Sequence, residues 1–162
     1  MRDFKTITAF ATAFLIAGAI IFSGKHVQAI EIKSSSTSVE FSTKTSALTG
    51  NNLVSYASKF VGTPYKRGGT TATGFDCSGF TSFLYRQFGI TLSRTTGGQM
   101  SGGVRIASLA EALPGDIICY AGHVALYIGN GQIIHASVPG STVKQASATG
   151  INLSIQSIRR YW

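Results

Sequence analysis

Hydrophobic and polar positions follow two different periods along the chain. Between residues 51 and 89 the apolar side chains recur every three or four positions, which is typical of helices with one buried face. We expect a first helix that is capped by Asn51 or Asn52 and ends at Gly62. A second helix is predicted from Asp76-Cys77 to Gly89, after a loop rich in glycine.

Beyond residue 107 the period shortens. Ser108 and Glu111 have the spacing of a capping box, which predicts one short helical turn before Pro114-Gly115. Short β-rich runs separated by glycines follow, at residues 116–120, 123–128, 132–137 and 155–162. Helices followed by strands predict an α+β fold, in which N-terminal helices pack on an antiparallel sheet.

The N-terminal part of the chain has a different pattern. Basic residues precede an apolar stretch over residues 7–22, and Val27-Gln28-Ala29 then offers the small residues that a signal peptidase reads. We expect a signal peptide at 1–29, secretion of the mature chain, and no stable membrane insertion after removal of the signal peptide. Residues 30–50 are dominated by Ser and Thr and predict a flexible linker, which leaves 51–162 as one domain.

Composition narrows the class of partner. The chain carries 14 Lys+Arg against 6 Asp+Glu, a formal charge of +8, yet only 12% of its residues are charged. This excludes a disordered polyampholyte and a coiled coil, and it favours anionic surroundings. The basic residues are scattered and no recognition helix or aromatic strand motif accompanies them, so we expect no nucleic-acid partner.

The candidate chemistry lies in two cysteines and two histidines of residues 51–162. Cys77 stands at the predicted start of a helix, where free N–H groups and the helix dipole stabilise a thiolate and lower its pKa. Cys119 falls in the middle of a predicted strand, where a buried inert thiol is common. Because the spacings resemble no zinc site, we expect no metal and no other cofactor.

A thiolate nucleophile needs a base, and the base needs a group that orients it. His123 and His135 can serve together only if they share a sheet face, which depends on the register of their hairpin. We expect a three-residue loop at 129–131 with Ile128 opposite Gln132, which puts both imidazoles on one face. A two-residue turn would put them on opposite faces.

Seven short motifs occur in a fixed order along residues 51–162. They are Gly62-Thr63-Pro64-Tyr65, Gly68-Gly69, Asp76-Cys77-Ser78-Gly79-Phe80, Arg94-Thr95-Thr96 with Gln99, Pro114-Gly115-Asp116, Gly122-His123-Val124 and Ile134-His135-Ala136. In these motifs the chain resembles the NlpC/P60 family of cell-wall cysteine peptidases over residues 51–162. The resemblance implies a papain-like core, a secreted or wall-associated protein, and hydrolysis of peptidoglycan stem peptides, typically at the bond from γ-D-glutamate to the diamino acid.

The resemblance also implies residue roles. It makes Cys77 the nucleophile, His123 the general base and then acid, and His135 the residue that orients His123. The backbone N–H of Cys77 would meet the developing oxyanion.

Tyr65, Asp76 and Ser78 match positions that bind the amine of a free stem N-terminus in some family members. For Asp76 a plain helix cap is an equally good interpretation. Arg94 and Gln99 match a further family segment, and we interpret them as a surface charge and loop packing.

Two alternatives stay open. A cysteine amidase of the related CHAP type would cut the sugar–peptide amide of the same polymer. A non-catalytic basic module, held together by a Cys77–Cys119 disulfide, would adhere to anionic wall polymers. In each case we expect a monomer.

Overall fold

The computed structural model describes residues 49–162. The predicted signal peptide and residues 30–48 of the predicted linker lie outside the described residues. No helix in the described range combines the length and the apolar character needed to cross a membrane.

The described residues form helices followed by an antiparallel sheet, as the sequence pattern predicts. The helical elements are α1 (Gly50–Ala57), the 3-10 turn η1 (Ser58–Phe60), α2 (Cys77–Arg86) and α3 (Thr96–Ser101). A small hairpin, β1 (Thr70–Thr71) and β2 (Gly74–Phe75), precedes α2. The main sheet has the order β3-β8-β4-β5-β6-β7. Its strands are β3 (Val104–Ile106), β4 (Ile117–Tyr120), β5 (His123–Gly129), β6 (Gln132–Ala136), β7 (Val143–Ser147) and β8 (Ile155–Arg160).

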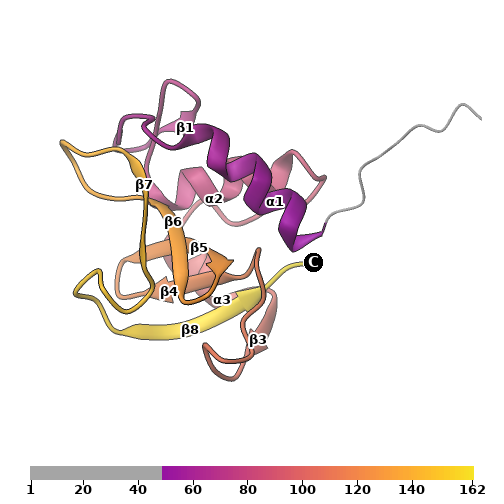
Figure 1. Cartoon of the computed structure of the whole chain (residues 1–162). Coiled ribbons are helices and arrows are strands. Elements are labelled where there is room, and N and C mark those ends of the chain that lie inside the picture. The colour runs from indigo at the N-terminus through magenta and orange to yellow at the C-terminus, as the bar shows by residue number, and fades with distance from the viewer. Residues whose placement is uncertain (1–48) are drawn as a thin grey trace, which may run out of the picture. The chain divides into compact units, whose positions relative to one another are not determined.

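The centre of the sheet is buried on both faces because β4 is apolar at every position. All four residues of β4 are buried. Ile117 and Cys119 belong to the cluster that packs against α1 and α2, and Ile118 and Tyr120 belong to a second cluster on the opposite face. In Figure 1, α1 and α2 lie together on one side of β4, β5 and β6.

The first helix starts earlier than predicted. Thr49, rather than Asn51 or Asn52, is the N-cap, and its hydroxyl accepts the Asn52 N–H at 3.2 Å. Because the cap lies at Thr49, the first turn begins at Gly50 and both asparagines fall inside the helix. Gly50 has no room for a side chain, since a Cβ on it would lie 1.6 Å from the Pro114 carbonyl oxygen.

Several elements have too little apolar pattern to predict. Strand β7 buries only Val143, β3 is exposed at two of three positions, and α3 is six residues long. The predicted helical turn at residues 108–111 is a single turn, in which Glu111 N–H donates to the Ser108 carbonyl at 3.2 Å. The Ser108 hydroxyl donates to the Glu111 carboxylate at 3.1 Å. The predicted capping pair is therefore joined by a hydrogen bond between its two side chains.

Candidate active site

A cleft with a volume of about 580 Å³ brings together four of the six predicted site residues. They are Tyr65, Cys77, His123 and His135; Asp76 and Ser78 are not among the residues that line it. The remaining lining comes from the β4–β5 turn, the loop after β6, strand β7 and the loop before β8. These residues are Ala121, Gly122, Ser137, Val138, Pro139, Lys144, Ala146, Gly150, Ile151, Asn152 and Leu153.

Cys77 is the first residue of α2, as predicted. Asp76 caps this helix, and its carboxylate accepts the Gly79 N–H at 2.7 Å. A Cβ on Gly79 would lie 2.0 Å from the Gly69 carbonyl oxygen, so the first turn of α2 rests directly on the preceding loop. The helix start is therefore held from two sides, which sets the position of the Cys77 side chain.

The two histidines share a face of the sheet, but not through the predicted loop. Gly129 pairs with Gln132, so the turn has two residues, Asn130 and Gly131, both with positive φ. The register shifts between Tyr127 and Gly129, so one extra residue bulges from β5. This bulge restores the parity that a two-residue turn alone would lose.

The same face carries a direct contact between the imidazoles. His123 Nε2 lies 2.8 Å from His135 Nδ1. Both rings are buried, and the Tyr120 ring packs beside His123 at a centroid distance of 5.9 Å. His135 Nε2 has no hydrogen-bond partner among the described residues. This geometry leaves Nδ1 of His123 free to exchange a proton in the cleft.

Burial controls ionisation at the site. Burial raises the pKa of the Cys77 thiol, although the backbone N–H groups of Val124 and Ser78 oppose this by stabilising the thiolate. The net direction contradicts the lowered pKa that we expect from the helix start alone. Burial also lowers the pKa of His123 and of His135 to about 4. At neutral pH the site thus holds a thiol and two neutral imidazoles, and a neutral imidazole is the form that can accept a proton.

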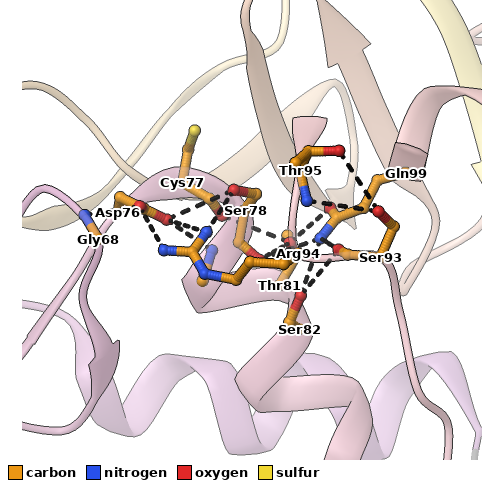
Figure 2. A network of polar contacts seen from close by, with 11 residues as sticks. Gly68, Asp76, Cys77, Ser78, Thr81, Ser82, Ser93, Arg94, Thr95 and Gln99 are labelled. Atoms are coloured by element: carbon orange, nitrogen blue, oxygen red, sulfur yellow. Dashed lines mark hydrogen bonds and ion pairs between the residues drawn. The ribbon is translucent and has the colours of Figure 1, made fainter. Parts of the chain in front are cut away.

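Asp76 and Ser78 form a polar network with Arg94 beside the helix start (Figure 2). Arg94 donates to the two Asp76 oxygens at 3.0 and 2.6 Å, and to the Ser78 hydroxyl at 2.9 Å. Gly68 N–H donates to Asp76 at 2.9 Å. Burial opposes ionisation of Asp76, but the hydrogen bonds from Arg94 and Gly79 prevail and hold the pKa of the carboxyl below its usual value. Arg94 is therefore more than the surface charge we expect.

Gln99 lies at the other end of this network, fully buried (Figure 2). Its amide nitrogen donates to the carbonyl oxygens of Ser78 and Ser93 at 3.0 and 2.8 Å, and its amide oxygen accepts from Thr81 at 2.7 Å. These bonds tie α3 and the Arg94 loop to α2. The interpretation of Gln99 as loop packing agrees with this arrangement.

Cys77 and Cys119 are both free thiols. The disulfide that the non-catalytic alternative requires is therefore not formed. Cys119 is fully buried in β4, where burial raises its pKa, as is typical of a structural thiol. Within residues 49–162, no group of three His, Cys, Asp or Glu side chains could hold a metal ion.

The sequence pattern does not identify Lys144, Val138 or Leu153 as residues of the cleft. Lys144 lies on β7 directly opposite His135, and Val138 and Leu153 come from the loops on either side of β7. The signal that could identify Lys144 is the β6–β7 pairing. That pairing is hidden in the sequence because β7 is an edge strand with one buried residue.

Comparison with known proteins gives a family match. The model of the NlpC/P60 family matches residues 62–159. The crystal structure of the NlpC/p60 domain of the peptidoglycan hydrolase SagA aligns with a TM-score of 0.64 at 38% identity, and it covers 70% of this chain and 100% of that domain.

Two curated relatives match over the same part of the chain. A protein named probable endopeptidase p60 from Listeria seeligeri is 42% identical over 93 residues, which is 54% of this chain and 18% of the relative. A protein named γ-D-glutamyl-L-lysine dipeptidyl-peptidase from Bacillus cereus is 39% identical over 94 residues, 53% of this chain and 28% of the relative. This chain thus spans less than a third of either relative.

Proposed function

The chain belongs to the NlpC/P60 family, and we propose that it is a secreted peptidoglycan hydrolase that cleaves the peptide stems of the polymer. The scissile bond is the amide that joins γ-D-glutamate to the diamino acid. The observation that carries this proposal is the meeting of Cys77, His123 and His135 in one cleft of a family member. The signal peptide at residues 1–29 supplies the export that a wall substrate requires.

Cys77 and His123 perform the bond cleavage. As Cys77 Sγ attacks the γ-carbonyl carbon, His123 accepts the thiol proton, and the resulting oxyanion is met by the Cys77 backbone N–H at the start of α2. His123 then gives this proton to the leaving amine of the diamino acid, and a thioester remains. A water molecule, deprotonated by His123, then attacks the thioester and breaks its C–S bond. His123 returns the proton to the departing sulfur, which restores the thiol, and the γ-carboxylate is released.

His135 orients the base. Through the 2.8 Å contact it accepts the Nε2–H of His123, so the lone pair of His123 that can accept the thiol proton is the one on Nδ1. Resting thiol and imidazole are both neutral, because burial raises the Cys77 pKa and lowers the His123 pKa. We therefore propose that proton transfer accompanies the attack and that no ion pair precedes it.

The three residues proposed to bind substrate differ in their surroundings: Tyr65 lines the cleft, whereas Asp76 and Ser78 do not line it. Asp76 and Ser78 are occupied by Arg94 and by the helix cap. A free stem amine would have to share the Asp76 carboxylate with Arg94, so we propose that Asp76 acts mainly by holding the start of α2.

Digestion of defined muropeptides, followed by mass spectrometry, tests the proposal. A peptidase of this specificity produces a new amine on the diamino acid, whereas a CHAP-type amidase separates the whole peptide from the sugar. A non-catalytic wall-binding module produces neither. The test uses the variants Cys77→Ala and Cys119→Ala: the first should be inactive and folded, and the second should hydrolyse the same bond. Activity in Cys77→Ala would refute the nucleophile.

A further inference from the structure

The cleft has one full charge, and no catalytic step above uses it. Lys144 lies directly across the β6–β7 ladder from His135, so the two side chains stand on the same face of the sheet. Both line the cleft. The side chain of Lys144 is exposed and, in the described part of the chain, has no hydrogen bond or ion pair.

Within residues 49–162, no acidic side chain pairs with this ammonium group. None of the residues that line the cleft is Asp or Glu. The acidic residues of 49–162 are Asp76, Asp116 and Glu111; the first two pair with arginines, and the third accepts from Ser108. The charge of Lys144 also acts on the site, since it adds to the effects that lower the His135 pKa. The cleft is therefore electropositive at the wall formed by β7.

The proposed reaction indicates which part of the substrate lies against the β7 wall of the cleft. His123 returns its proton to the leaving amine, so the diamino acid lies against the imidazole pair. Lys144 is the neighbour of that pair across the ladder. Val138 and Leu153, which are 57% and 39% exposed, add apolar surface to the same cleft. Methylenes with a terminal carboxylate would complement such a surface.

We propose that Lys144 is a specificity residue that binds a side-chain carboxylate on the diamino acid of the leaving group. The inference rests on the proposed function, and it names the substrate class: stems whose diamino acid carries a second carboxylate, as diaminopimelate does, rather than stems with lysine. A lysine side chain would bring an ammonium group toward Lys144 without a carboxylate to offset it.

Three peptides test this inference on the full chain. Each contains L-alanyl-γ-D-glutamyl linked to a diamino acid whose α-carboxyl is an amide, so that the diamino acid has no carboxylate except in its side chain. The first contains meso-diaminopimelate, the second contains the same residue with its side-chain carboxyl amidated, and the third contains L-lysine. Values of kcat/KM are measured for the wild-type chain, Lys144→Met, Lys144→Glu and the control Lys59→Met, which changes a lysine that is not in the cleft.

We expect the wild-type chain and Lys59→Met to favour the free carboxylate over its amide by roughly tenfold, mostly through KM. Lys144→Met should remove this preference and cleave the amidated peptide at the wild-type rate. Lys144→Glu should reverse the preference in favour of the lysine peptide. Equal rates on all three peptides with the wild-type chain, or a preference that survives in Lys144→Met, would overturn the role of Lys144 but not the proposed function. Failure of the wild-type chain to cleave any of the peptides would overturn the proposed function as well.

Discussion

His123 Nε2 lies 2.8 Å from His135 Nδ1, across the hairpin of β5 and β6. At this distance one ring must donate its N–H and the other must accept it, so the two rings fix each other's tautomer. If His123 donates, its Nδ1 is unprotonated and can take the thiol proton of Cys77. The hydrogen bond between the two rings therefore also determines which nitrogen of His123 can act as a base.

Replacement of His135 tests this coupling. His135→Ala should lower kcat on the order of 10²-fold or more with a small change in KM, because His123 loses the group that selects its tautomer. His135→Asn should recover part of the rate, since an amide oxygen can accept the same N–H. Single-turnover kinetics on a stem peptide separates the two constants. Equal rates in the Ala and Asn variants would show that His135 only fills space.

Acid should destabilise the fold through the same two residues. Burial lowers the pKa of each histidine to about 4, from an ordinary value of 6.5. Between these values the unfolded chain binds more protons than the folded chain, so stability rises with pH across the window and is lost as pH falls through it. Each histidine contributes at most about 1.4 kcal/mol per pH unit.

Urea unfolding at several pH values between 4 and 7 measures this slope. A His123→Asn, His135→Asn double variant should have a flatter dependence of the unfolding free energy on pH in the same window. The activity of the wild-type chain should fall on the acid side with an apparent pKa near 4, where His123 gains a proton. An acid limb near 6.5 would contradict the lowered pKa of His123.

Asp76 should matter more as a cap than as a charge. Asp76→Asn keeps a side-chain oxygen for the Gly79 N–H but weakens the pair with Arg94, whose side chain is 44% exposed. Asp76→Ala removes both contacts. We expect Asp76→Ala to lose about 1–2 kcal/mol of stability and Asp76→Asn less than about 1 kcal/mol. Thermal unfolding compares the two losses, and a loss in Asp76→Asn as large as that in Asp76→Ala would give the ion pair the greater role.

Part of the fold and site follows from the sequence because local chemistry determines it. The start of α2 at Cys77 depends on an Asp cap and an apolar stripe, both visible in the chain. The shared face of His123 and His135 is confirmed, although the predicted loop is wrong. Sequence cannot distinguish a three-residue loop from a two-residue turn with a bulge in β5, since both keep the same parity beyond the turn.

Other features depend on contacts that are distant in the chain. The Cys77 pKa is raised because tertiary packing buries the thiol, which outweighs the local effect of the helix start. Position 50 requires glycine because the chain passes close to Pro114 there. Lys144 joins the cleft only through the pairing of β7 with β6. In each case the deciding neighbour lies more than a few residues away, where periodicity and capping patterns carry no information.

Gly79 should be the most sensitive small residue near Cys77, the proposed nucleophile. A Cβ at this position would lie 2.0 Å from the Gly69 carbonyl oxygen and 2.9 Å from the Asp76 carboxylate. Both neighbours are held in place, one as backbone and the other by Arg94. Gly79→Ala must therefore displace the first turn of α2, at an expected cost of about 1–3 kcal/mol, and Cys77 with it.

Gly97 provides the matched control for this substitution. It lies in α3, and a Cβ there would meet nothing within 4 Å. Gly97→Ala should leave activity unchanged and stabilise the chain by up to about 1 kcal/mol, because alanine loses less backbone entropy in a helix. Thermal unfolding and stem-peptide hydrolysis of both variants are compared. If Gly79→Ala kept both stability and rate, the contact between α2 and the Gly69 loop would not hold Cys77 in place.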